Sequence, residues 1–309
     1  MSLETDLLLD RRRLKRRLAF WRIFAVLVVV LALAGLAGGS PGIGRPYVAR
    51  LFVRGVITED RDLTRALDAL ASDPLASALV VEIDSPGGSV AGGEQLHDAI
   101  ARVAAKKPVV AVMDGVAASA GYMIAVPAAR IFCSPATLTG SIGVLLETGD
   151  VSGLLGKLGI NADAIVSGPL KDQPSFTKPL SPEGRVAMQS LVMDMYEQFV
   201  GMVAAGRHMD PARVRALADG RAYTGRQALP LGLVDEFGGD GEARAWLEKV
   251  RAVPSTLPER EVQSRSLAQR LIGDQLGGRL GILGLPLKLL FSQDVMLDGG
   301  WALWQPSGE

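Results

Sequence analysis

From Tyr47 onward, short apolar segments of strand length alternate with helix-length amphipathic segments. The predicted strands are residues 47–53, 56–57, 79–83, 108–113, 130–133, 141–146 and 162–166. The predicted helices among them are residues 63–71, 90–105 and 120–128. Strands that alternate with helices are typical of parallel sheets with crossover helices, so the sequence predicts an α/β fold.

The pattern changes in the second half of the chain. A long helix is predicted over 181–207, because Ser181 and Pro182 suit an N-cap and a first helical position. Another helix starts in the same way at Asp210, and 242–250 is also helical in pattern. Residues 254–265 are polar, whereas 280–291 are strongly apolar. This apolar stretch is too short to span a membrane, and suits either a surface-lying or partner-bound helix or a terminal helix packed on the core.

Near the N-terminus, a cluster of basic residues precedes an uncharged apolar segment. The cluster consists of Arg11, Arg12, Arg13, Lys15, Arg16, Arg17 and Arg22. Such a cluster stays in the cytoplasm, and the apolar segment is long enough to cross a bilayer. We therefore predict a cytoplasmic tail (1–17), a transmembrane anchor (18–39) and a linker (40–46). A cleaved signal peptide is the alternative, because Ala32-Leu33-Ala34 resembles a cleavage site.

The composition excludes several classes of function. Lysine plus arginine and aspartate plus glutamate both number 33, so the balance gives no indication of nucleic-acid binding. A single cysteine, Cys133, excludes an internal disulfide and a cysteine-based metal cluster, and its apolar strand suggests a core position. The sequence contains no phosphate-binding loop, metal-ligand spacing or dinucleotide fingerprint, so we expect no cofactor.

A serine in the stretch GVAASAGYM is the strongest candidate for chemistry. Ser119 follows a predicted strand and precedes a helix, where free N–H groups favour a developing alkoxide. The chain has only two histidines, so a lysine is the more available base, provided that burial lowers its pKa towards neutrality. Lys171 is the preferred base because it follows a predicted strand, and Lys157 and Lys178 are rivals. Each of these residues also has an ordinary interpretation, as a packing serine or a surface lysine.

The stretch DSPGGS follows the preceding predicted strand. Adjacent glycines let a backbone approach a ligand closely and direct N–H groups at it, which suits an oxyanion hole. The loops of neighbouring parallel strands lie side by side, so Gly88 and Ala120 are candidate N–H donors for the carbonyl that Ser119 attacks. Ser141 is positioned either to orient the lysine or simply to begin a strand.

Four stretches in order, VVEIDSPGGSVAGGEQLHDAI, VAASAGYMIAVPA, TLTGSIGV and SGPLKDQPSF, closely resemble the signal peptide peptidase A family in its single-repeat bacterial form. The resemblance extends over residues 47–239, which defines a predicted peptidase domain followed by an extension, 240–309. It implies a ClpP/crotonase-like α/β fold, a spiral of ββα units, carried by the N-terminal transmembrane helix.

The resemblance also implies the site and its setting. Ser119 and Lys171 would form a Ser–Lys dyad, with Ser141 hydrogen-bonded to the lysine and Gly87 or Gly88 in the oxyanion hole. Substrates of the family are remnant signal peptides and other apolar segments. The enzymes are anchored in the bacterial inner membrane, with the catalytic domain facing the periplasm or exterior. They form ring- or bowl-shaped homo-oligomers, and in single-repeat members a neighbour can complete the groove.

One departure from the family pattern concerns Ala120, which stands where many members have glycine. Its methyl group is expected to narrow the pocket while leaving the N–H donor in place. Alternatives to the signal peptide peptidase remain a related membrane peptidase with other substrates, a coenzyme A thioester enzyme of similar fold, and an inactive scaffold.

Overall fold

The computed structural model describes residues 44–262, Trp301–Leu303 and, near the N-terminus, residues 17, 21, 22, 24 and 25. The strands are β1 (Tyr47–Arg54), β2 (Ala76–Ser85), β3 (Gly87–Ser89), β4 (Val109–Ala118), β5 (Arg130–Cys133), β6 (Leu138–Gly140), β7 (Ala222–Thr224), β8 (Glu236–Phe237), β9 (Glu259–Glu261) and β10 (Trp301–Leu303). The helices are α2 (Arg61–Ser72), α3 (Val90–Ala104), α4 (Ala120–Ala125), α5 (Ser152–Lys157), α6 (Pro182–Arg207), α7 (Pro211–Leu217), α8 (Gly225–Leu231) and α9 (Asp240–Arg251).

The chain divides into two compact units, Met1–Pro46 and Tyr47–Glu309, and every element named above belongs to the second. The predicted anchor, 18–39, lies almost wholly outside the described residues. Within the part of the chain that is described, no helix combines the length and the apolar character that a membrane crossing requires. The apolar stretch 280–291 also lies outside the described residues.

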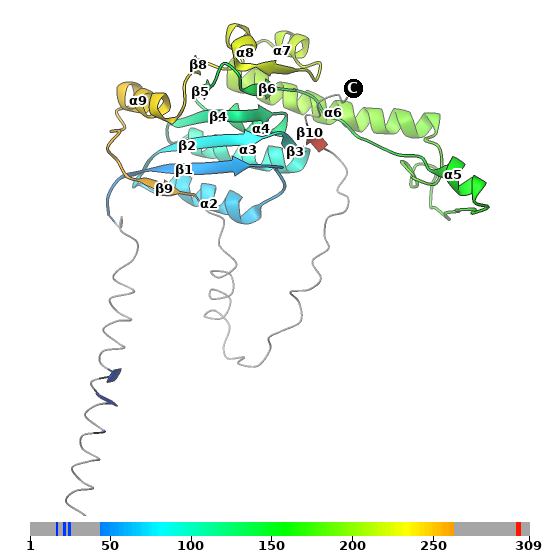
Figure 1. Cartoon of the computed structure of the whole chain (residues 1–309), viewed down its shortest axis with the longest axis horizontal. Helices are drawn as coiled ribbons and strands as arrows, with labels where there is room; N and C mark the ends of the chain where they lie inside the picture. Colours follow the sequence, from blue (N-terminus) through cyan, green and yellow to red (C-terminus); the bar gives the residue numbers. More distant parts are fainter. Residues whose placement is uncertain (1–16, 18–20, 23, 26–43, 263–300, 304–309) are drawn as a thin grey trace, which may run out of the picture. The chain divides into compact units, whose positions relative to one another are not determined.

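An eight-stranded sheet organises the second unit (Figure 1). Its main order is β7-β6-β4-β2-β1-β9; off this path, β5 pairs with β4, and β8 pairs with β5. All pairings in this sheet are parallel except that of β6 with β7. The predicted parallel α/β architecture is therefore confirmed, because consecutive strands return in the same direction through helices.

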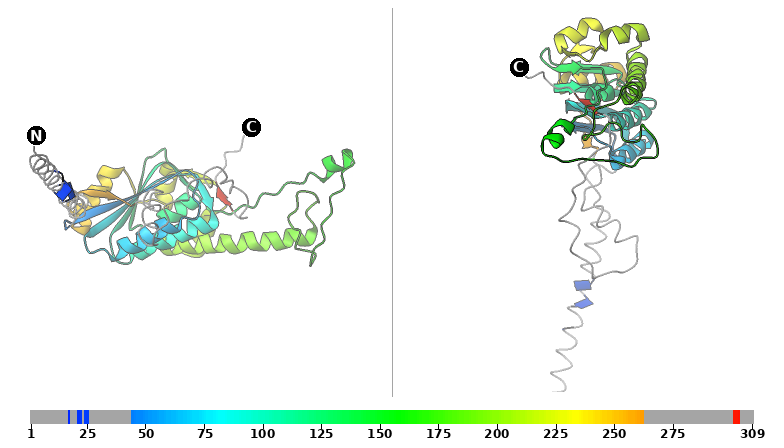
Figure 2. Two further views of the ribbon diagram at one scale, coloured as in Figure 1. Left: turned by 90° about the horizontal axis from the view of Figure 1, so that it is seen from below. Right: turned by 90° about the vertical axis from the view of Figure 1, so that its right-hand side faces the viewer.

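Both faces of the sheet are buried, which explains why the central strands are apolar without interruption. Leu79, Val81 and Ile83 of β2 belong to the main core, which also contains buried residues of α2, α3 and α4. The alternate residue Val80 points to a second cluster, which includes Leu247 of α9. Because successive strand side chains face opposite sides, one short apolar run supplies both layers. Figure 2 shows α2 and α3 covering one side of the sheet.

The strand β4 changes partners along its length. Its first half pairs with β5, from Val110 opposite Arg130, whereas its last residues pair with β6, with Ala118 opposite Gly140. The side chain of Thr139 donates a hydrogen bond of 2.8 Å to the Ala117 carbonyl oxygen and stabilises this second pairing. The end of β4 is thereby held between β2 and β6, immediately before Ser119.

An arm, residues 146–181, and the first half of α6 project from this core (Figure 2). The C-terminal half of α6 is anchored by buried Phe199 and Val203. By contrast, Val186 and Leu191 in its N-terminal half are exposed. Two predicted strands in this region are wrong: residues 141–146 and 162–166 form no strand. Another difference is β3, since its Gly-Gly stretch was expected to be a loop.

A buried ion pair is expected to dominate the polar contribution to stability. The Arg207 guanidinium makes bonds of 2.6 and 3.0 Å to the Asp235 carboxylate, and only 8 % of the arginine side chain is exposed. Asp235→Ala should lower the free energy of unfolding by about 3 kcal/mol, because an uncompensated buried charge remains. Glu197→Ala, which removes the exposed partner of Arg215, should cost much less, because water and salt screen an exposed pair. Equal losses in urea unfolding of the two variants would contradict this assignment.

Candidate active site

The register of two neighbouring strands brings the two glycine-rich motifs together. Ser85 at the end of β2 lies opposite Ala117 of β4, two residues before Ser119. A side chain at Gly121 would place its Cβ 2.8 Å from the Ser85 carbonyl oxygen, so only glycine allows this approach. The expectation that the DSPGGS segment lies beside the Ser119 turn is confirmed.

Ser119 stands at the junction of β4 and α4 in an unusual backbone conformation. Its φ of 55° and ψ of −121° are rarely adopted by residues other than glycine, and such strain is often found at functional sites. The N–H of Ser119 donates to the Gly140 carbonyl oxygen at 2.8 Å, and its own carbonyl accepts from the Met123 N–H at 2.9 Å. The residue is 1 % exposed, and its Oγ has no hydrogen-bond partner among the described residues. Burying a hydroxyl without a hydrogen-bond partner costs free energy, so such a group in a folded protein often has a functional role.

The candidate oxyanion donors are backbone N–H groups, and they differ in whether they already donate a hydrogen bond elsewhere. The Gly87 N–H donates to the Ser85 Oγ at 3.1 Å, and the Gly87 carbonyl accepts from the Ile57 N–H. Gly87 is thus already engaged, and Gly88 is the better candidate of the two glycines. The N–H of Gly88 points to the opposite edge of β3, and that of Ala120 is the first of α4, with no partner inside the helix. Gly88 and Ala120 therefore remain the candidate pair of donors, and the edge of β3 to which the Gly88 N–H points is the one that pairs with β10.

The sequence did not indicate the contacts that hold β3 in place. The Ser85 hydroxyl accepts from the Gly87 N–H and lies 3.3 Å from the Gly87 carbonyl oxygen. The Ser89 hydroxyl donates to Glu59 at 2.8 Å and accepts from the Gly92 N–H. Serines flanking a Pro-Gly-Gly stretch are a usable signal, because serine side chains often bond to nearby backbone groups.

The methyl group of Ala120 does not narrow the site. Ala120 is fully buried, and a Cβ added to Gly93 of α3 would lie 2.9 Å from the Ala120 Cβ. The extra methyl therefore packs between α4 and α3, where Gly93 leaves room for it. The expectation of a narrowed pocket was wrong because the side chain faces the core.

The two serines of the predicted site lie close together, whereas the lysine does not join them. Ser141 follows Gly140, whose carbonyl binds the Ser119 N–H, and is itself 6 % exposed with a φ of 48°. Lys171 is exposed in the segment of the arm between α5 and α6. The sequence predicted a strand immediately before Lys171, and the structure has no strand there. Lys171 makes no hydrogen bond to the Ser119 Oγ within the described part of this chain.

The rival bases and nucleophile are less suitable. Lys178 is ion-paired with Asp172 at 3.3 Å and with Asp163 at 3.6 Å. Burial raises the pKa of Cys133 to about 11, which keeps the thiol protonated at neutral pH. Among the described residues, no group of His, Cys, Asp and Glu side chains could hold a metal ion.

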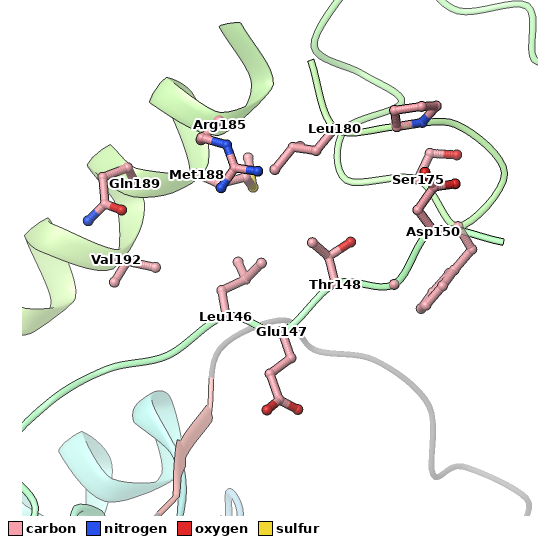
Figure 3. Close-up of a pocket in the computed structure, with 13 residues that line it drawn as sticks. Leu146, Glu147, Thr148, Asp150, Ser175, Leu180, Arg185, Met188, Gln189 and Val192 are labelled. Carbon is pink, nitrogen blue, oxygen red and sulfur yellow. The ribbon is translucent and has the colours of Figure 1, made fainter. Parts of the chain in front are cut away.

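A groove of about 1060 Å³ lies between the arm and α6 rather than at Ser119 (Figure 3). Leu146 and Thr148 lie on one side of it, and Met188 and Val192 of α6 lie on the other. The lining also carries three charged side chains, Glu147, Asp150 and Arg185. The arm and α6 thus form a groove in which apolar and charged side chains are mixed.

Comparison with known proteins agrees with these observations. The model of Peptidase family S49 matches residues 101–254, and the model of Clp protease matches residues 51–137. "Putative protease slr0021" of Synechocystis sp. is 36% identical over 266 residues, which cover 84% of this chain and 96% of that protein. "Putative signal peptide peptidase SppA" of Enterococcus faecium is 34% identical over 238 residues, covering 76% of this chain and 68% of that protein.

Among solved structures, ClpP1 from Listeria monocytogenes aligns with a TM-score of 0.42 at 19% identity. The alignment covers 63% of this chain and 93% of that one. The extent of the sequence matches, across nearly the whole of the Synechocystis protein, establishes the relationship. This chain is a serine peptidase and belongs to Peptidase family S49.

Proposed function

We propose that Ser119 is the nucleophile of a Ser–Lys dyad that cleaves apolar peptides at the membrane. The observation that carries this proposal is the buried Ser119 hydroxyl, which has no hydrogen-bond partner in the described part of the chain and stands at the start of α4, where α4 meets the end of β2. Acyl transfer requires a nucleophile, donors for the oxyanion and a base, and Lys171 is the base in this proposal.

The reaction proceeds in two halves. The neutral amine of Lys171 takes the proton of the Ser119 hydroxyl while the oxygen bonds to the peptide carbonyl carbon. The lysine then protonates the leaving amine, and an acyl-enzyme remains. Water, deprotonated by the same lysine, releases the acyl group and restores the serine. In both halves Gly88 and Ala120 would stabilise the negative oxygen, and each such donor is typically worth about 3–4 kcal/mol.

Lys171 reaches Ser119 from a neighbouring copy in this proposal. Exposed apolar side chains line the arm, which a stable monomer would rarely leave in water. They are Val151, Leu154, Leu158, Ile160, Ile165, Val166, Leu170 and Phe176. A second copy that covers this surface would also bring the exposed Lys171 towards the core of its neighbour. Head-to-tail contacts of this kind close into rings, so we infer a ring- or bowl-shaped homo-oligomer.

The substrate class and location follow from the N-terminal sequence and one relative. The basic cluster followed by an apolar segment supports a single-pass anchor in a bacterial inner membrane, with the peptidase facing the periplasm or exterior. The name of the Enterococcus relative indicates signal peptides as substrates. We therefore propose remnant signal peptides and other apolar segments as substrates of this chain. A related membrane peptidase with other substrates is the nearest alternative.

Peptide preference tests this proposal directly. The full-length protein in detergent should cleave a fluorogenic peptide with a leucine- and alanine-rich centre. A matched peptide with aspartates at two central positions should have kcat/KM lower by about 10-fold or more, because an apolar cleft desolvates each carboxylate. Equal kcat/KM values for the two peptides would instead favour a peptidase with other substrates. Hydrolysis of acyl-coenzyme A that persists in Ser119→Ala would favour the thioester enzyme.

A further inference from the structure

The last described segment of the chain pairs with the strand that carries the oxyanion donor. Residues Trp301–Leu303 form β10, which is antiparallel to β3 (Figure 1). In this register Trp301 lies opposite Ser89, Ala302 opposite Gly88 and Leu303 opposite Gly87. The two strands form a small sheet of their own, separate from the main sheet.

The backbone hydrogen bonds of β3 show which of its edges β10 occupies. On one edge, the Ile57 N–H donates to the Gly87 carbonyl oxygen, and the Ile57 carbonyl oxygen accepts from the Ser89 N–H, both at 2.9 Å. Backbone groups of successive strand residues point to alternate edges. The N–H and carbonyl of Gly88 therefore point to the other edge, where Ala302 lies.

The edge that β10 occupies recognises backbone rather than side chains. Gly87 and Gly88 carry no side chain, and the Ser89 hydroxyl is engaged with Glu59 and the Gly92 N–H. Strand addition to such an edge derives its affinity from main-chain hydrogen bonds and tolerates many sequences. A segment of this chain and a substrate peptide are thus recognised by the same groups.

We propose that Trp301–Leu303 is a pseudo-substrate that occupies the peptide-binding edge of β3, with the Ala302 carbonyl at the Gly88 N–H. This inference rests on the proposed role of Gly88 as an oxyanion donor. A substrate would add to β3 in the same antiparallel direction, with the attacked carbonyl opposite Gly88. The C-terminal segment therefore competes with substrate, and the enzyme is partly self-inhibited.

A proline at position 302 tests the proposal in the full-length protein. Proline lacks the N–H that pairs with β3, so Ala302→Pro should release the segment from the ladder. If the segment fills the site for about 80–90 % of the time, the variant should show a KM for a fluorogenic peptide about 5- to 10-fold lower. Its Ser119 should react with a fluorophosphonate probe faster by the same factor, while kcat stays unchanged.

Ser307→Pro serves as the matched control, because it adds a proline outside β10 and should leave both quantities at the original values. A peptide of sequence GWALWQ, added in trans, should inhibit Ala302→Pro competitively. The same peptide with N-methylalanine in place of alanine should not inhibit. Unchanged KM and labelling rates in Ala302→Pro would overturn the proposal. If peptidase activity survives Ser119→Ala, the proposed function fails instead, so the two failures are distinguishable.

Discussion

Ser119→Ala is expected to lower kcat/KM for peptide hydrolysis by about 10⁴-fold or more, as for other serine nucleophiles. The loss follows because no acyl-enzyme can form when the proposed nucleophilic hydroxyl is removed. Steady-state kinetics of the full-length protein with the fluorogenic apolar peptide measures this effect. The variant should also lose all labelling by the fluorophosphonate probe.

Ser72→Ala is the matched control, since this exposed serine lies at the end of α2, away from the site. It should retain the activity and the labelling of the unchanged protein. Thermal unfolding should distinguish a lost nucleophile from a damaged fold, because the Ser119 Oγ makes no hydrogen bond within the described part of the chain. Activity of Ser119→Ala within about 10-fold of the original would show that another residue performs the attack.

Lys171→Ala is expected to cause a loss of similar size, and mixing the two inactive variants should restore activity. If each site takes its serine from one copy and its lysine from the next, random co-assembly of equal amounts leaves about a quarter of the sites intact. Each variant is refolded or co-expressed alone and with the other, and the specific activity of the mixture is compared with that of the unchanged protein.

Activity of the mixture shows whether the lysine comes from the same copy as the serine or from a neighbouring copy. A dyad formed within one copy would leave the mixture as inactive as its components. Lys157→Ala is the matched control, because this residue also lies in the arm but at the end of α5. It should be fully active alone.

The sequence predicted the centre of the molecule well because burial there is complete within one chain. Apolar runs at 79–83 and 108–113 coincide with β2 and β4, and the order of strands and helices follows the expected alternation. The same reasoning failed at 141–146 and 162–166. Those segments add no strand to the sheet, and Ile165 is fully exposed. An apolar pattern predicts that a segment will be buried, but it does not predict whether the same chain or another one buries it.

Sequence reasoning located the part of the candidate site that strand pairing positions, but not the part that the arm carries. The pairing of β4 with β2 and β6 brings Ser119 close to Ser141 and to the end of β2, as the order of the motifs already indicated. The position of Lys171 depends on the arm, and sequence spacing does not determine how an arm is directed. The strand β3 was missed because adjacent glycines disfavour strands, and its pairing with Ile57 and Trp301–Leu303 depends on tertiary structure.

The helix α6 is a rigid spacer between the anchored core and the arm that carries Lys171, the proposed base. Its 26 residues span roughly 40 Å without interruption, and only its second half is fixed to the core. Removing one residue from the projecting half would turn the arm by about 100° about the helix axis and draw it in by about 1.5 Å. In the proposed assembly, the reach of Lys171 towards a neighbouring Ser119 is therefore set by the number of residues in α6. In that assembly, catalytic geometry would depend on helix length as well as on side-chain chemistry.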